Sequence, residues 1–229
     1  MTKLVIAMEL AVFALCVMVD RSMPLGLSGG FRGPTLIQFG ALYGPVLESE
    51  PWRLLSACFV HGGLLHVGMN MLMFASLGAQ LERELGSSRS VLLFLATGVL
   101  GFVASFVWSG GMVFSVGASG GVFGQVGAFV GLLYARKDPR WKGALVRSLV
   151  YAVLLTLAIG RIDTAAHLGG FFAGIVLGFV LHKEQLALRL NKTASVLAAL
   201  ALLTSVASVV LSSLSPFSQA ARSSQELRE

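Results

Sequence analysis

The sequence predicts an all-α polytopic membrane protein, and three observations support that class. Hydrophobic residues make up 55% of the 229-residue chain and charged residues only 12%, against about 25% charged residues in an ordinary soluble domain. The mean hydropathy is +0.81. The apolar residues form long segments, and all six prolines lie between or beyond them. No predicted span therefore contains the residue that most often breaks a helix.

Seven apolar segments approach the length of about 20 residues that a helix needs to cross a bilayer. The first is short and carries Glu9, so a signal peptide is the alternative for it. That alternative is disfavoured because no small-x-small cleavage site follows cleanly before Asp20. The segments are Leu4–Val19, Gly62–Gln80, Ser90–Trp108, Met112–Ala135, Ala144–Gly160, Ala165–Leu181 and Ala194–Leu214.

The connection between the first two segments, residues 20–60, is much longer than the usual connection of about 4–6 residues. It is rich in apolar residues but has no continuous apolar run of spanning length. Tyr43 and Trp52 are amphipathic side chains of the kind that favour a membrane–water interface. We therefore expect short amphipathic helices that lie in the outer interface.

The basic residues are divided unequally between the two sides of a seven-span arrangement. The side with more of them is expected to be cytoplasmic, which places the N-terminus inside and the C-terminus outside. We expect the membrane to be the bacterial cytoplasmic (inner) membrane. The net charge of +6 therefore indicates topology and some affinity for anionic lipid, not a nucleic-acid partner. The cytoplasmic group is Lys3, Arg83, Arg89, Arg136, Lys137, Arg140, Lys142, Arg147, Lys183, Arg189 and Lys192, and the outer group is Arg21, Arg32, Arg53, Arg161, Arg222 and Arg228.

Ser119 is the candidate nucleophile because it lies in an apolar, glycine-rich segment. Polar groups at membrane depth are costly and are functional candidates by default. A helix face built for close packing, with an incidental serine, is the alternative. A second GxSG motif, around Ser28, lies in the outer loop and is expected to be a Gly/Ser turn. The glycines that follow Ser119 at helical spacing are Gly120, Gly124, Gly127 and Gly131.

Further polar residues are expected at the same depth as Ser119. His61, His66 and Asn70 lie at the start of the second segment, and His66 and Asn70 share a helix face because they are four residues apart. His167 lies at the start of the sixth segment. Segments two, four and six all begin at the outer face if the spans alternate, so these side chains should meet there.

These motifs together resemble those of the rhomboid intramembrane serine proteases. The resemblance covers about residues 21–181 and implies a six-helix rhomboid core, residues 1–182, that includes the outer interfacial loop 20–60. It also implies one additional C-terminal transmembrane helix with a short polar tail, residues 183–229. The motifs are Trp52-Arg53, His61-x4-His66-x3-Asn70, Gly117-x-Ser119-Gly120 and Ala166-His167-x2-Gly170-x3-Gly174.

The resemblance also implies the roles of the site residues. Ser119 would be the nucleophile and His167 its base, in a Ser–His dyad. His66, Asn70 and Ala118, with the backbone at Ser119, would stabilise the oxyanion.

Two further side chains near the predicted dyad need an interpretation. Phe123 stands where the family often has a tyrosine that stacks on the base histidine, so we expect stacking without a hydroxyl. Asp163 lies four residues before His167 and near Arg161. We expect it to be a solvated loop charge and not the third member of a triad.

The predicted function is that of a serine endopeptidase that cuts transmembrane helices of protein substrates near the outer face. An inactive rhomboid-like binding or chaperone module would be marked by loss of Ser119 or His167. A channel or transporter would carry polar residues along whole helices or a visible repeat. Cys16 and Cys58 form no zinc-type spacing, and a disulfide between them is the alternative. The sequence has no phosphate-binding Gly loop, EF-hand or HExxH motif, so no metal or cofactor is expected. The expected partners are the lipid bilayer and the substrates, and the sequence leaves the oligomeric state open.

Overall fold

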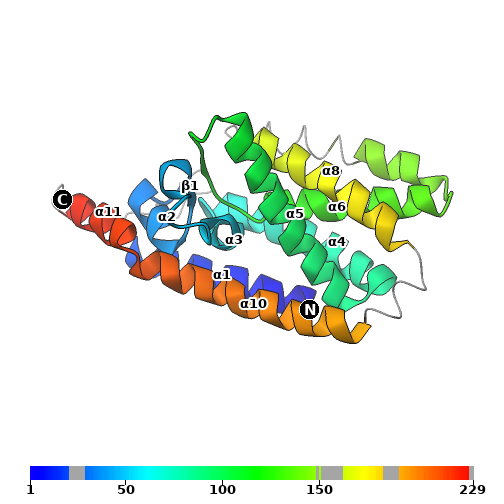
Figure 1. Ribbon diagram of the computed structural model, residues 1–229, viewed down its shortest axis with the longest axis horizontal. Coiled ribbons are helices and arrows are strands. Elements are labelled where there is room, and N and C mark those ends of the chain that lie inside the picture. The colour runs from blue at the N-terminus through cyan, green and yellow to red at the C-terminus, as the bar shows by residue number, and fades with distance from the viewer. Residues whose placement is uncertain (21–28, 148–149, 151–161, 183–190, 227–229) are drawn as a thin grey trace.

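The structure is a computed structural model that describes residues 1–20, 29–147, 150, 162–182 and 191–226. Within these residues the fold is a bundle of long helices with a group of short elements at one end (Figure 1). Five described helices are long and apolar enough to cross a membrane. They are α1 (Thr2–Val19), α4 (Leu64–Leu85), α5 (Ser87–Trp108), α8 (Thr164–Leu181) and α10 (Asn191–Leu214).

The helices agree with most of the predicted spans, and the fourth span is the main correction. Helix α6 (Ser119–Ala135) begins seven residues later than the predicted segment Met112–Ala135. The preceding residues instead form strand β2 (Phe114–Ser115), followed by Gly117 at φ +121°. A backbone at this φ suits glycine and cannot continue a right-handed helix. Most of the predicted segment Ala144–Gly160 lies outside the described residues.

The long connection between the first two predicted spans contains short elements, which Figure 1 shows gathered at one end of the molecule. Its location at the outer membrane interface stays a prediction. Strand β1 pairs antiparallel with β2 over two residue pairs, a small addition to the predicted all-α fold. The apolar residues of the loop, such as Phe39, Leu42 and Phe59, are buried in the core of the protein. The elements are α2 (Gly33–Phe39), β1 (Leu42–Tyr43), the 3-10 helix η1 (Gly44–Val46), α3 (Arg53–Ser56) and the 3-10 helix η2 (Ala57–Phe59).

The C-terminal helices pack against the short elements of this loop. The predicted polar tail forms helix α11 (Pro216–Glu226), which packs against α2. The buried Arg53 guanidinium donates from Nη2 to Ser218 Oγ at 2.9 Å and from Nε to Glu50 Oε2 at 2.6 Å. The ring of Phe217 stacks on Tyr43 with centroids 5.4 Å apart. The end of α10 and helix α11 therefore pack against the loop, and Tyr43 contacts α11 through Phe217.

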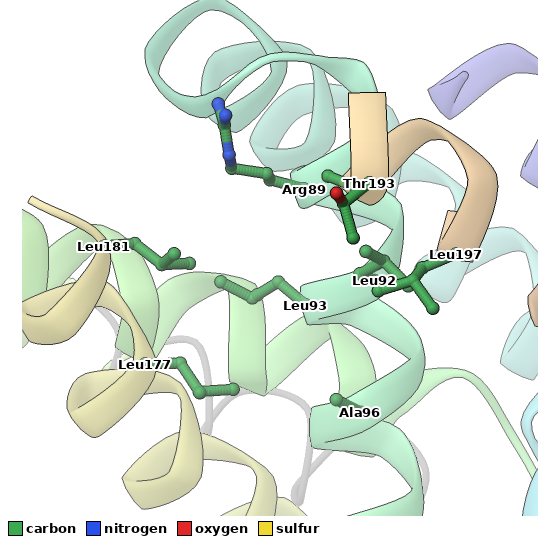
Figure 2. A pocket seen from close by; sticks show the side chains of 9 residues that line it. Arg89, Leu92, Leu93, Ala96, Leu177, Leu181, Thr193 and Leu197 are labelled. Carbon is green, nitrogen blue, oxygen red and sulfur yellow. The ribbon is translucent and has the colours of Figure 1, made fainter. Parts of the chain in front are cut away.

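The other end of α10 is packed less closely. An apolar cavity of about 220 Å³ lies between α5, α8 and the start of α10 (Figure 2). Leu93 of α5, Leu177 of α8 and Leu197 of α10 are among its lining residues, and Arg89 lies at its edge. This cavity contains neither Ser119 nor His167, so it is separate from the candidate active site.

Among the described helices, α6 and α8 make the most extensive contact, and glycines permit it. A Cβ atom on Gly174 would lie only 2.0 Å from the Gly124 carbonyl oxygen, and one on Gly127 only 2.0 Å from that of Phe171. Small residues let backbones approach in this way, as the predicted glycine face required. The contacts Gly120–Gly170, Gly124–Gly174 and Ala128–Gly178 all share one sequence offset, so the two helices run parallel.

Candidate active site

The parallel packing of α6 and α8 brings Ser119 and His167 together. Ser119 is the first residue of α6, and His167 lies in the first turn of α8. His167 Nε2 is 2.6 Å from Ser119 Oγ, and both side chains are buried. This is the hydrogen-bond distance that a base needs to take the proton from a serine hydroxyl.

The ring of Phe123 packs against the histidine. Phe123 lies one turn after Ser119 on α6, and its ring stacks on His167 with centroids 4.5 Å apart and an interplanar angle of 20°. The position therefore provides the stacking contact that the sequence predicted. Because a phenylalanine has no hydroxyl, the contact orients the ring without offering it a hydrogen bond.

His66 faces the backbone just before Ser119. A Cβ atom on Gly117 would lie 2.7 Å from His66 Nε2, so only a glycine fits beside this ring. His66 Nδ1 accepts a hydrogen bond of 3.3 Å from the Gly62 N–H. In the neutral ring the proton is then on Nε2, which makes this nitrogen a donor on the side of Gly117.

Asn70 lies one turn after His66 on the same face of α4, as expected. Its side chain is 4% exposed, and Nδ2 donates to the His66 carbonyl oxygen at 2.9 Å. An amide nitrogen carries two hydrogens, so this bond leaves one N–H for another acceptor. The contact also fixes the amide relative to the His66 backbone.

The predicted oxyanion role of Ala118 stays a prediction, and its N–H already has a partner in the structure. The Ala118 N–H donates to His61 Nε2 at 3.3 Å, so it is already used. The N–H groups of Ser119 and the next residues of α6 have no acceptor within their own helix, because they form its first turn. They also lie at the positive end of the helix dipole, and are the backbone donors that the site offers to an oxyanion.

Asp163 is not the solvated charge that the sequence predicted. Its Oδ1 accepts from the Ala166 N–H at 2.9 Å and so caps the start of α8. Its Oδ2 accepts from Ser105 Oγ at 2.6 Å. Both carboxylate oxygens are therefore occupied by groups other than the His167 ring. The capping position, four residues before His167 at a helix start, was a signal available in the sequence.

Other sequence features lie outside this cluster. Among the residues that the structure describes, no group of three or more His, Cys, Asp or Glu side chains could hold a metal ion. Cys16 and Cys58 are buried, free thiols. Ser28, in the second GxSG motif, lies outside the described residues. The site thus consists of a serine, two histidines, an asparagine and the start of a helix.

The fold is an apolar helical bundle, and its two parallel helices α6 and α8 begin with a buried Ser–His pair. These features together define a polytopic membrane protein with side chains of the hydrolase type. The rhomboid domain family model matches residues 48–184 of the chain. The chain therefore belongs to the rhomboid family. The match includes both helices of the Ser–His pair.

Curated relatives agree with this membership. The chain is 39% identical to RHOMBOID-like protein 5 of Arabidopsis thaliana over 158 residues, which are 65% of this chain and 50% of that protein. It is 35% identical to the rhomboid protease GluP of Bacillus subtilis over 189 residues, 77% of this chain and 34% of the relative. Rhomboid-type serine protease 2 of Emericella nidulans is 34% identical over 165 residues, 70% of this chain and 33% of the relative. The chain thus matches half or less of each relative's length.

Proposed function

We propose that this protein is an intramembrane serine endopeptidase in which Ser119 is the nucleophile and His167 the general base. The observation that carries the proposal is the 2.6 Å contact between Ser119 Oγ and His167 Nε2 in an apolar helical bundle. Two relatives are named as proteases, one of them as a serine protease, which supports the same reaction class.

The proposed reaction follows the usual course of serine catalysis. Ser119 Oγ attacks the scissile carbonyl carbon while His167 Nε2 takes the hydroxyl proton. The imidazolium then gives this proton to the leaving amine, and an acyl-enzyme forms on Ser119. A water molecule, deprotonated by His167, hydrolyses the acyl-enzyme and regenerates the serine. The two occupied oxygens of Asp163 favour a dyad over a triad.

The oxyanion would be stabilised by donors that surround the start of α6. We assign this role to the N–H groups of the first turn, the His66 Nε2–H and the second N–H of Asn70. Preorganised donors of this kind stabilise charge that develops only in the transition state. Ala118 contributes to this site by its small size and not through its N–H, which is bound to His61.

The substrate would be a transmembrane helix that is cut near the outer face. The proposed arrangement of seven spans, with the N-terminus inside and the C-terminus outside, would put the start of α6 and α8 at that face. A peptide bond within an intact helix has a carbonyl that is already hydrogen-bonded, and unwinding it in lipid leaves costly unpaired groups. The enzyme should therefore prefer substrate segments weakened by Gly, Pro or polar residues at that depth.

The experiment is labelling of the purified protein in liposomes with a fluorophosphonate, together with cleavage of a model transmembrane substrate. Ser119→Ala should abolish both signals, and His167→Ala should slow labelling strongly and abolish turnover. Ser28→Ala, in the other GxSG motif, is the matched control and should behave like the parent protein. Labelling retained in Ser119→Ala, or lost in Ser28→Ala, would overturn the assignment.

A further inference from the structure

A buried carboxylate in the first helix has no role in the proposed reaction. Glu9 lies in the middle of the apolar helix α1, and its side chain is 0% exposed. An ionisable group at such a position is costly and marks a function or a specific partner. Its Oε2 lies 3.4 Å from Nδ1 of His61, which is also 0% exposed. Within the described part of the chain, no hydrogen bond satisfies either carboxylate oxygen.

His61 connects this carboxylate to the backbone next to the nucleophile. Its Nε2 accepts the Ala118 N–H at 3.3 Å, and Ala118 directly precedes Ser119. Its ring also packs edge-on against the His66 ring, with centroids 5.1 Å apart. One imidazole therefore contacts the carboxylate of α1, the residue before the nucleophile and a proposed oxyanion donor.

The hydrogen bond to Ala118 determines the tautomer of His61. A backbone N–H can only donate, so Nε2 must be unprotonated. Burial lowers the pKa of His61 well below its usual value, with the nearby His66 acting in the same direction, so the ring is neutral. The single ring proton is then on Nδ1, 3.4 Å from Glu9 Oε2. This carboxyl oxygen can accept it, and the backbone of Phe59 also interacts with the ring.

We propose that Glu9 and His61 form a buried positioning pair that holds the Gly117–Ala118 peptide, and with it Ser119 and His66, in the geometry for reaction. This inference rests on the proposed protease function. Without Glu9, the Nδ1 proton loses this acceptor, and the tautomer with an unprotonated Nε2 is favoured less strongly over the other one. The other tautomer would point an Nε2–H at the Ala118 N–H, and two donors facing each other would push the backbone away. In this way the first helix contributes to a site formed by α4, α6 and α8.

The substitution pair Glu9→Leu and Glu9→Gln separates this role from simple packing. A leucine removes the acceptor, whereas a glutamine keeps an amide oxygen that can accept from Nδ1. A misplacement of about 1 Å can cost about 100-fold in rate. We therefore expect Glu9→Leu to lower kcat by about 10- to 100-fold with KM nearly unchanged, and to slow fluorophosphonate labelling in parallel. Glu9→Gln should stay within about threefold of the parent protein.

A matched control is Val5→Ala, one turn away on the same buried face of α1. It creates a cavity in the packing of this helix and should lower thermal stability without changing kcat below the melting temperature. If Glu9→Leu retains the parent kcat, or if its loss merely equals the loss of folded protein as in Val5→Ala, the positioning role is wrong. If the parent protein itself shows no labelling that depends on Ser119, the proposed function fails instead.

A spectroscopic measurement tests the same inference independently of activity. The chain has four histidines, so ¹⁵N shifts of the histidine rings can be assigned by single substitutions. His61 should be in the Nδ1–H tautomer in the parent protein and should shift toward a mixture in Glu9→Leu. An Nε2–H tautomer or an imidazolium in the parent protein at neutral pH would overturn the proposal.

Discussion

The contact between α6 and α8 leads to a prediction that tests how the site is built. Gly174 lies two turns after His167 on α8, and the nearest neighbours of an added Cβ atom there are backbone atoms of Gly124. A Cβ atom at this position would lie 2.0 Å from the Gly124 carbonyl oxygen of α6. Gly174→Ala should therefore impair catalysis only by moving one helix relative to the other.

The size of the effect follows from the distances. Ordinary van der Waals contact of a Cβ atom begins at 3.4 Å, so the alanine must move about 1.4 Å away from the carbonyl oxygen. A shift of only about 1 Å would stretch the 2.6 Å bond between Ser119 Oγ and His167 Nε2 beyond hydrogen-bond range. We expect kcat to fall by about 100-fold and stability by about 1–3 kcal/mol, the usual cost of overpacking.

The assay combines cleavage of a transmembrane substrate, the rate of fluorophosphonate labelling, and thermal unfolding in detergent. Gly68→Ala is the matched control, because Gly68 lies within helix α4 and its added Cβ atom would meet nothing within 4 Å. That variant should keep the parent activity and gain slightly in stability, since alanine favours a helix over glycine.

A graded series strengthens the test. Gly170→Ala, Gly174→Ala and Gly178→Ala meet backbone oxygens at 2.1, 2.0 and 2.1 Å, at increasing distance from His167. The loss of kcat should decrease along this series while the loss of stability stays similar. Parent-like kcat and melting temperature in Gly174→Ala would show that the two backbones are not in close contact, and the reasoning would be refuted.

Three further predictions concern contacts around this pair. Phe123→Leu should lower kcat about tenfold at unchanged fold, since a leucine does not stack on His167, while Phe123→Tyr should retain activity; equal rates for the two would contradict the stacking role. Asp163→Ala should lower the stability of the protein in thermal unfolding by about 1 kcal/mol through loss of the helix cap, and Asp163→Asn should not; a loss of activity by several orders of magnitude in Asp163→Asn would indicate a triad. Phe217→Ala should lower stability by about 1 kcal/mol by removing the ring stacked on Tyr43, and an unchanged unfolding temperature would show that the tail contact contributes nothing.

Several features of the fold and the site could be predicted from local patterns in the sequence. Hydropathy and segment length predicted the spanning helices, because the bilayer imposes the same requirement on every residue of a span. The glycine spacing after Ser119 and in Gly170-x3-Gly174 predicted a close helix contact. Alternation of the spans then predicted that Ser119 and His167 would meet, although the predicted fourth span began seven residues before the helix that starts at Ser119. The ring of Phe123 on His167 followed from the family resemblance.

The tertiary structure decided what depends on the relative rotation of distant segments. In the sequence, Glu9 is recognisable simply as an ionisable residue within a short apolar span. The packing of α1 against the loop brings its carboxyl group next to His61. The direction of the Ala118 N–H depends on the backbone turn at Gly117, and its partner is the His61 ring. The sequence thus determined the membrane class, most of the helices and the candidate reactive side chains, because these depend on solvent and on local spacing. It did not determine the hydrogen-bond partners of His61 and Asp163, because a partner is set by orientation in three dimensions and a change of about 1 Å makes or breaks it.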